Sequence, residues 1–325
     1  MSIAPDLIAQ ETDLYIIQVN TATTYGGSTN SLQFRLPMYG TADYSVDWEY
    51  DGTFAADTTT TEHNILNTYA AAGVKTIAVR TNSGNPRINF NGGGDRLKLT
   101  SIDQWGTAVW ESVETAYMSC SNMNVAATDA PDLSNATSTS QMFQACTKLN
   151  SANLNTWDIG TITDFSNMFH TCTIFNSSLA DWNIGENTGT DDITMQSMFQ
   201  ACYSFNQPLE TWETNANSTM AYVNNMQNMF YTYVHRSHNR GVFNQPLGAW
   251  DVGRNTNFVS MFMGQQRFNA ALEGWNISEN TGTDPINMAS MFRFCTGFNQ
   301  PLEGWETDAN STMAYVSTTN NMFAC

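Results

Sequence analysis

Residues Met198 to Trp212 read MFQACYSFNQPLETW, and a closely similar stretch, MFRFCTGFNQPLEGW, occupies Met291 to Trp305. Looser copies make the Met-Phe pairs recur at intervals of 26, 30, 31, 32, 30 and 31 residues. Self-similarity at such a period is typical of stacked repeats, each of which buries its apolar face against the next. The sequence therefore predicts a solenoid of about eight coils, which start near residues 116, 142, 168, 198, 229, 261, 291 and 322.

The order of residues within one repeat predicts its local structure. Met195, Met198, Phe199 and Cys202 follow the i, i+3, i+4, i+7 spacing of a short amphipathic helix. Proline ends that helix, and the Leu-x-x-Trp part is expected to be an extended segment paired with the next coil. An asparagine follows the apolar residue, usually phenylalanine, that comes three positions after the cysteine position of a repeat. Its side-chain amide is expected to satisfy backbone groups of a neighbouring coil in an asparagine ladder.

The composition restricts the classes of partner. The chain has 325 residues, 12 Lys plus Arg against 30 Asp plus Glu, and a net charge of -18. Because nucleic acids and anionic membranes attract basic surfaces, this charge argues against both. No apolar run is long enough for a membrane span, and the N-terminus has no signal-peptide pattern. An extracellular or virion-surface location is expected.

The cysteines keep the phase of the repeat. Five of them lie four residues after the first position of a Met-Phe site, and Cys325 lies three after Met322. Stacked in this way, they are expected to be buried reduced thiols, with bridges between adjacent coils as the alternative. No zinc-type Cys pair is present. The prediction includes no resident cofactor.

The N-terminal third has a different pattern. After a polar leader at 1–12, strand-like runs at 14–19, 32–36, 44–48, 76–80 and 87–90 alternate with Gly-, Asn- and Thr-rich turns. They predict an antiparallel β-sandwich at 13–90, followed by a linker at 91–115 and the repeats at 116–325. The stretches YSVDWEYDG at 44–52 and NTYAAAGVKTIAV at 67–79 resemble polycystic-kidney-disease-like (PKD-like) domains, although Asn67 and Lys75 depart from that pattern.

The repeat string M-x-x-M-F-x-x-C-x-x-F-N-Q-x-L-x-x-W, together with residues 105–143, resembles the BspA-like leucine-rich-repeat surface proteins. The resemblance covers about residues 87–325. It implies a leucine-rich-repeat-like solenoid that is exposed at a surface and used for adhesion or recognition, with no catalytic residues. The expected function is therefore binding of a protein or glycan receptor, on a phage or viral particle. The alternatives are a purely structural decoration or fibre subunit and a bacterial cell-surface adhesin.

Acidic residues flank the Leu-x-x-Trp segments and predict an acidic stripe. It can be a solvated face, a surface that binds a basic partner, or a site of calcium-mediated contacts with glycans. The neighbouring tryptophans are expected to lie in the core rather than form a platform for sugars. The residues of the stripe are Asp158, Asp181, Glu210, Glu213, Asp251, Glu273, Glu303 and Glu306.

An insertion after Met229-Phe230 concentrates histidine and arginine, and loops on a rigid scaffold often carry function. Its candidate binding residues are Tyr231, Tyr233, His235, Arg236, His238 and Arg240. The chain shows no nucleophile with a base and an orienting group, so the prediction is that it is not an enzyme. The final NNMFAC begins a repeat that it does not complete, and neighbouring subunits are expected to cover this coil.

Overall fold

The computed structural model describes residues 11–189, 191–216, 218–233, 241–277, 284–307 and 313–324. Its N-terminal part contains β1 (Leu14–Asn20), β2 (Gln33–Leu36), β3 (Met38–Gly40), β4 (Asp43–Asp47), β5 (Thr58–Thr60), β6 (Ile65–Thr68), β7 (Val74–Ser83), β8 (Pro86–Ile88) and β9 (Leu99–Gln104). The remainder contains β10 (Asn124–Val125), η1 (Ala152–Thr156), β11 (Ile193–Thr194), α1 (Thr211–Thr214), β12 (Val223–Asn225), β13 (Ile286–Asn287), α2 (Gly304–Thr307) and β14 (Val316–Thr318).

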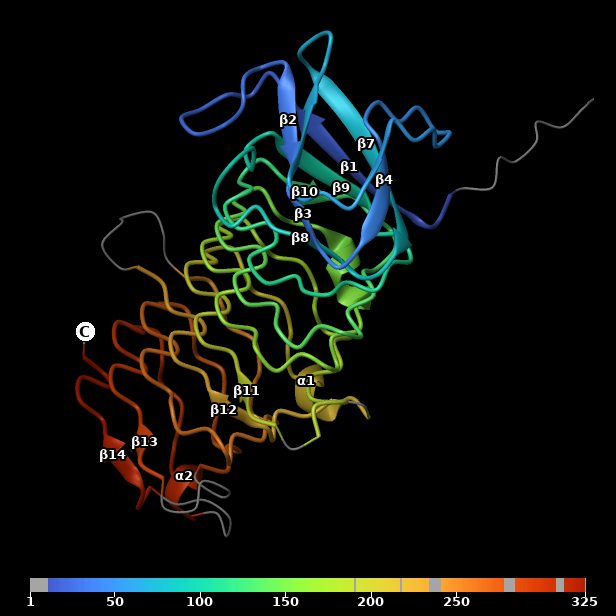
Figure 1. Ribbon diagram of the computed structural model, residues 1–325. Helices are drawn as coiled ribbons and strands as arrows, with labels where there is room; N and C mark the ends of the chain where they lie inside the picture. The colour runs from blue at the N-terminus through green and yellow to red at the C-terminus, as the bar shows by residue number, and fades with distance from the viewer. Residues whose placement is uncertain are drawn as a thin grey trace, which may run out of the picture.

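A six-stranded sheet of order β10-β9-β1-β7-β4-β5 forms the N-terminal end of the molecule (Figure 1). Its central strand β1 pairs antiparallel with β7 and β9, whereas the edge strand β10 is parallel to β9. The five strand-like runs of the sequence all coincide with strands. The segment expected to be a linker differs, because it contains β9, which pairs with β1 in the centre of the sheet.

The expected fold class is wrong. Instead of a β-sandwich followed by a leucine-rich-repeat-like solenoid, the described residues form the mixed six-stranded sheet and four two-stranded sheets, β2-β6, β3-β8, β11-β12 and β13-β14. Within the described ranges of the repeats, no continuous column of strands forms. Between β11-β12 and β13-β14, parallel pairing is reduced to isolated bridges such as Asn225 with Asn257. The repeats are turns laid on one another, and we call residues 116–324 the turn stack.

The turn at Met198 shows why the expected helix does not form. Ser197 and Ala201 have φ angles of 57° and 60°, in the left-handed region, which interrupts a right-handed helix. Alternate N–H groups then point in two directions. Phe199 donates to Met229 O in the next unit (2.9 Å), whereas Met198 donates to Met195 O within its own unit (3.2 Å). In this way the backbone N–H groups of the turn find hydrogen-bond acceptors although the turn is neither a helix nor a strand.

The expected extended Leu-x-x-Trp segment is also not observed. In the two best-matched copies this segment continues into the short helices α1 and α2. The parallel strand pairs β11-β12 and β13-β14 lie instead before the methionines that begin the next turns. Both helices lie on the same side of the turn stack (Figure 1). The indole of Trp212 points inward from α1 and is fully buried.

The interior of the turn stack consists of side-chain columns, as the spacing predicts. The Met, Phe, Cys, Leu and Trp positions of the central units are buried. One phenylalanine column, from Phe143 to Phe323, has ring centroids 5.4 to 5.9 Å apart and nearly parallel planes. Because a single unit cannot enclose these rings, their burial depends on the stacking of units.

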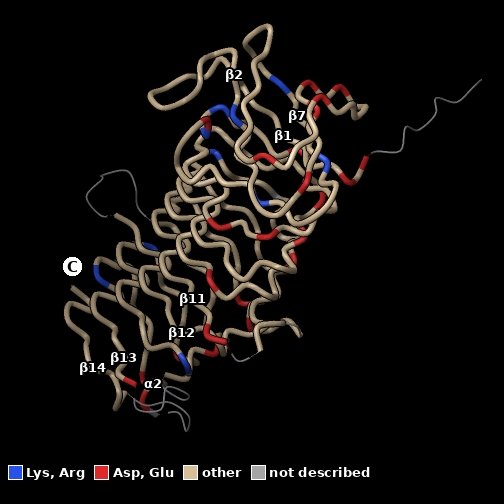
Figure 2. The backbone as a smooth tube through the Cα atoms, viewed as in Figure 1, with Lys and Arg blue, Asp and Glu red and all other residues tan. Residues whose placement is uncertain are grey.

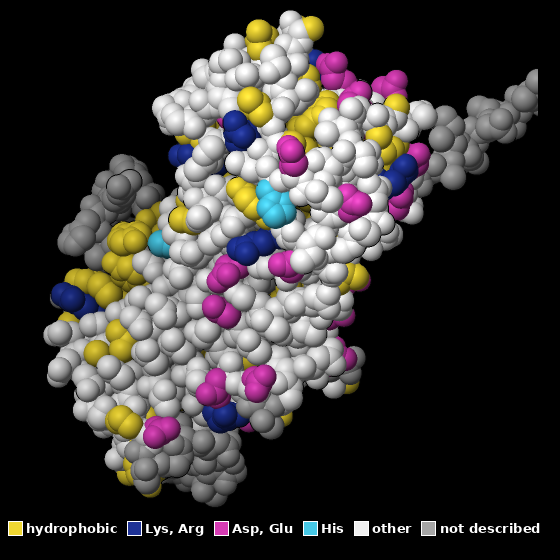
Figure 3. Space-filling view, in the orientation of Figure 1, with side chains coloured by type: hydrophobic (Ala, Val, Ile, Leu, Met, Phe, Trp, Pro, Cys, Tyr) yellow, Lys and Arg dark blue, Asp and Glu magenta, His cyan; other side chains and the backbone are white. Residues whose placement is uncertain are grey.

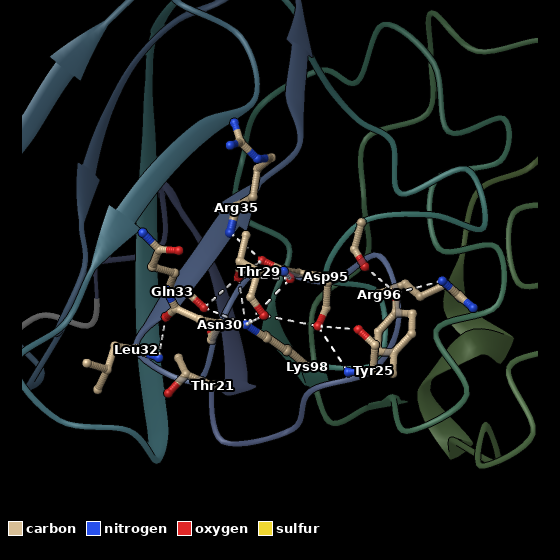
Figure 4. A network of polar contacts seen from close by, with 12 residues as sticks. Thr21, Tyr25, Thr29, Asn30, Leu32, Gln33, Arg35, Asp95, Arg96 and Lys98 are labelled. Carbon is tan, nitrogen blue, oxygen red and sulfur yellow. Dashed lines mark hydrogen bonds and ion pairs between the residues drawn. The ribbon is translucent and has the colours of Figure 1, made fainter.

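A buried ion pair joins the segment before β9 to β2 and to the loop that precedes β2 (Figure 4). Lys98 and Asp95 are fully buried, with Nζ and Oδ1 3.5 Å apart. The Asp95 carboxylate accepts the N–H groups of Thr29 (2.8 Å) and Arg35 (2.7 Å), and Lys98 Nζ donates to Gln33 O (2.6 Å). Burial lowers the pKa of Lys98. These bonds compensate for taking both charges out of water.

Candidate functional site

The predicted asparagine ladder is present. The side-chain oxygen of each asparagine accepts the backbone N–H of the asparagine in the next unit, as in Asn206 N to Asn176 Oδ1 (2.9 Å). The six rungs have N···O distances between 2.7 and 3.0 Å. The ladder runs along the outside of the turn stack from Asn124 to Asn299 and fixes the register of the units.

Two further ladders were not foreseen from the sequence. The indole N–H of Trp212 donates to Leu179 O of the preceding unit (2.8 Å), and four other tryptophans repeat this bond. The thiol of Cys202 contacts Phe169 O at 2.9 Å. The five described cysteines are buried and unbridged, which confirms the expectation of reduced core thiols. Burial raises the pKa of the Cys202 thiol.

Part of the acidic stripe forms a cleft that is lined by three consecutive units. Asp158 and Asp181 line an open cavity of about 390 Å³ together with Asn183, Glu186 and Asn215. All three carboxylate side chains are exposed, whereas the rings of Trp157 and Trp182 beneath them are buried. The two tryptophans therefore pack beneath the cleft, and neither exposes a ring face on which a sugar could stack. Among the residues that the structure describes, no cationic side chain lines this cavity.

Hydrogen bonds hold the polar groups of the cleft in place. Asn183 Nδ2 donates to Asp158 Oδ1 (2.8 Å) and also bonds to Glu186, while Asn183 Oδ1 accepts the N–H of Ile159 (3.0 Å). Asp181 accepts a bond from the amide of Asn155. Because each carboxylate carries two oxygens with several acceptor positions, the cleft retains capacity to accept hydrogen bonds from a ligand.

The same Asn–Asp pairing recurs further along the turn stack. Asn276 Nδ2 donates to Asp251 Oδ1 (2.8 Å), and Asn276 Oδ1 accepts the N–H of Val252 (2.8 Å). Glu213 is half-buried beside this pair and accepts the N–H of Met220 (2.7 Å) and Asp251 (3.3 Å). Burial raises the pKa of Glu213. These acidic residues brace the backbone, which is a structural role.

The remaining acidic positions do not join the cleft. Glu306 accepts the N–H of Met313 (3.1 Å), as Glu213 does in its own unit, and Glu273 and Glu303 are exposed. Glu210 precedes α1 and makes no side-chain cap. Acidic side chains therefore occur along the turn stack as far as α2, with few basic ones among them (Figure 2). In the part of the chain that the structure describes, no three His, Cys, Asp or Glu side chains gather to hold a metal ion.

The insertion is described only where it leaves the turn stack. Tyr231 and Tyr233 contact each other edge to face with centroids 5.0 Å apart, and Gln200 Nε2 donates to the Tyr233 hydroxyl (3.1 Å). Tyr233 is 40% exposed. The other candidate residues of the insertion, His235, Arg236, His238 and Arg240, lie outside the described residues. On the visible face, hydrophobic side chains gather along one edge of a surface that is otherwise mostly uncharged (Figure 3).

Gln265 was missed, although the sequence contained a signal. It stands where other units have cysteine, and its buried amide donates to Phe230 O (2.6 Å) while its oxygen accepts Phe243 N–H (3.2 Å). Gln265 thus links Phe230, just before the insertion, to Phe243, just after it, through two hydrogen bonds. The sequence analysis considered only acidic residues that flank the Leu-x-x-Trp segments. It therefore missed three residues of the cleft, Asn183, Glu186 and Asn215.

The comparisons define the family. Residues 111–233 and 219–324 match the family model described as "Mycoplasma protein of unknown function, DUF285". The chain belongs to this family, and the two matches together span the whole turn stack. No curated protein and no solved structure matches the chain. Of the helices in the described ranges, none is long and apolar enough to span a membrane.

Proposed function

We propose that this protein is a recognition module without catalytic activity, in which the turn stack binds a protein or glycan receptor through the cleft at Asp158, Asp181 and Glu186. The resemblance to BspA-like surface proteins supports adhesion as the setting, and an extracellular or virion surface as the location. The observation that carries the proposal is a rigidly held, open cavity whose described lining combines three exposed carboxylates with amides and no cationic side chain.

The chemistry of the cleft favours a ligand rich in hydrogen-bond donors. Carboxylates only accept hydrogen bonds when ionised, so sugar hydroxyls and ammonium groups match them better than anions do. The volume of about 390 Å³ lies in the range of small-ligand sites. The described lining has no histidine, cysteine or lysine, and its serine hydroxyl donates to a backbone carbonyl. It therefore supplies groups that bind, and no hydroxyl or thiol nucleophile beside a histidine or lysine base.

The test is a binding screen with the full chain against neutral and amino-sugar glycans and against lysine-rich peptides. Asp181→Asn and Glu186→Gln remove charge at exposed positions and keep an oxygen acceptor. Since a hydrogen bond to a charged group contributes about 1.5–3 kcal/mol and a neutral one about 0.5–1.5 kcal/mol, each change should weaken binding about 5- to 10-fold. Asp51→Asn, at an exposed position in the N-terminal part, is the matched control and should bind like the wild type.

Equal binding by the two cleft variants and the wild type would remove the cleft as the recognition site. A chain that binds neither ligand class, yet assembles with copies of itself into particles or fibres, would favour the structural alternative. Glycan binding that Asp181→Asn abolishes and Asp51→Asn leaves intact supports the proposal.

A further inference from the structure

The charges of the turn stack are divided between two parts of each repeat. We call the part from the Met-Phe site of a unit to its ladder asparagine the turn arc. Between residues 116 and 324 the sequence has 17 Asp plus Glu and six Lys plus Arg. None of the acidic residues lies in a turn arc. Five of the six basic residues do, and they are Lys148, Arg236, Arg240, Arg267 and Arg293.

Hydrogen bonds between units place the turn arcs over one another. The N–H of Thr232 donates to Met263 O of the next unit (2.9 Å). The N–H of Gly264 donates in the same way to Arg293 O (2.9 Å). Tyr231, Met263 and Arg293 therefore occupy one position in successive units. Acidic and basic segments of the turn stack accordingly lie mostly on different sides (Figure 2).

The turn arcs expose apolar side chains next to basic ones. Ile174 is 48% exposed and Tyr233 is 40% exposed. Phe294 is partly exposed, and the Arg293 guanidinium lies over its ring, 4.7 Å from the centroid. On the visible edge of the turn stack, hydrophobic side chains adjoin a histidine and a basic side chain (Figure 3). The turn arcs thus form an apolar surface with cations beside it.

The arginines of this surface have no acidic partner among the described residues. Neither Arg267 nor Arg293 forms an ion pair there, and Arg293 Nε is buried without a hydrogen-bond acceptor. By contrast, Arg254 lies outside the turn arcs and contacts Asp192 at 2.6 Å. Because guanidinium groups bind carboxylates in a planar, two-pronged geometry, the turn arcs fit the carboxylates of another molecule.

The composition of the turn arcs is that of a protein–protein interface. Aromatic residues, Met and Arg are enriched at the core of such interfaces, whereas Asp and Glu are depleted. Tyr203, Tyr231 and Met263 are partly exposed in the turn arcs, and no Asp or Glu lies among them. The surface therefore suits a partner protein that presents carboxylates at the spacing of the units.

We propose that the turn arcs of one copy of this chain bind the acidic side of a second copy, with the two turn stacks parallel. Arg267 and Glu273 belong to one unit, and Arg293 and Glu303 belong to the next. Two copies at the same level therefore offer both pairs at once, since the units of both have the same spacing. Glu273 and Glu303 are exposed and lie in later units than the cleft.

This contact joins two different surfaces and does not close. Each added copy leaves one free turn-arc surface and one free acidic side, so a row of copies forms instead of a symmetric dimer. The net charge of -18 on each copy opposes their approach. At about 0.15 M salt, however, exposed charges more than about 8 Å apart are largely screened, whereas pairs within an interface are screened less. The inference does not depend on what the cleft binds.

The experiment measures association of the full chain by sedimentation velocity from micromolar to millimolar concentration, at about 0.15 M salt. Species larger than a dimer should grow with concentration. Arg267→Glu/Arg293→Glu makes two attractive pairs repulsive and should weaken association about tenfold or more. Lys75→Glu/Arg254→Glu changes the net charge equally outside the turn arcs and should associate like the wild type.

Mixing two variants tests whether the contact joins different surfaces. Glu273→Gln/Glu303→Gln removes carboxylates from the acidic side and leaves the turn arcs intact. This variant and Arg267→Glu/Arg293→Glu should each be monomeric at concentrations where the wild type associates. Their mixture should form a heterodimer that does not extend, because each variant keeps the surface that the other lacks. If the reversal fails to fold, Arg267→Gln/Arg293→Gln replaces it.

A wild-type chain that stays monomeric at millimolar concentration would overturn the proposal. So would equal association of Arg267→Glu/Arg293→Glu and the wild type, or a mixture of the two variants without heterodimer. A chain that stays monomeric yet binds a poly-glutamate peptide would also overturn it, because an acidic partner other than a second copy would then occupy the turn arcs.

Discussion

Replacing Asn206 by alanine should lower the free energy of unfolding by about 0.5–1.5 kcal/mol, the net contribution of one neutral hydrogen bond. Asn206 Oδ1 accepts the N–H of Asn244 at 2.8 Å. Alanine keeps the Asn206 N–H that donates to Asn176, so only the upper rung is lost. Asn244 is exposed, and water can therefore satisfy its N–H, which places the cost in this range rather than at the larger penalty of a buried unpaired donor.

The chain contains its own control in the same sequence context. Asn299 lies in an identical Phe-Asn-Gln-Pro-Leu string, but no described residue donates to its side-chain oxygen. Asn299→Ala should change the free energy of unfolding by less than about 0.5 kcal/mol, as at ordinary surface sites. Urea unfolding measures both values, and hydrogen exchange at the Asn244 amide should accelerate only in Asn206→Ala. Equal costs for the two variants, or unchanged exchange at Asn244, would show that the ladder contributes no stability.

Three further changes test other parts of the structure. Phe205→Ala should cost about 3–5 kcal/mol in urea unfolding because the ring is buried, and a cost below about 1 kcal/mol would contradict the column. The pKa of Glu213 is raised above its ordinary 4.5, so its charged form costs stability above that pH. Glu213→Gln should therefore match or exceed the wild-type urea midpoint at pH 7 and lose this advantage below pH 4.5; an advantage that grows with acidification refutes the assignment. Lys98→Met leaves the buried Asp95 carboxylate unpaired and should cost about 3–5 kcal/mol in thermal or urea unfolding, with partial recovery on adding Asp95→Asn. No recovery would show that the charge is not the cause.

Much of the turn stack could be predicted from the sequence because its apolar positions recur in phase. The period located the units, and the column positions of Phe205, Leu209 and Trp212 identified buried side chains. The asparagine ladder followed from the same reasoning, since a polar residue that recurs at one corner must satisfy the same backbone groups in each unit.

The backbone conformation could not be predicted in the same way. The i, i+3, i+4 spacing of Met195, Met198 and Phe199 is shared by a helix and by two successive turns, and the choice depends on φ angles that the sequence does not display. Serine and alanine at positions 197 and 201 gave no warning of left-handed geometry, because glycine and asparagine are the usual residues there.

The cleft was predicted only in part. Asp158 and Asp181 were selected because they adjoin tryptophan, and they do line one cavity. Glu186 and Asn215 reach it from segments that are distant in the repeat, so that spacing alone could not place them beside the aspartates. Glu213 shows the opposite error: it has the expected position but is engaged with the backbone of Met220.

The repetition of the same ladders at successive junctions of the turn stack has a mechanical consequence. A force that pulls on the C-terminal end acts first on the last unit, whose contacts with its neighbour resemble those at the next junction. The turn stack should therefore peel one unit at a time from that end, and each released unit of about 30 residues would lengthen the chain by about 100 Å. The buried Asp95–Lys98 pair, at the opposite end, would carry load last. If the protein holds two surfaces together, this arrangement would let it lengthen in steps while the sheet stays folded.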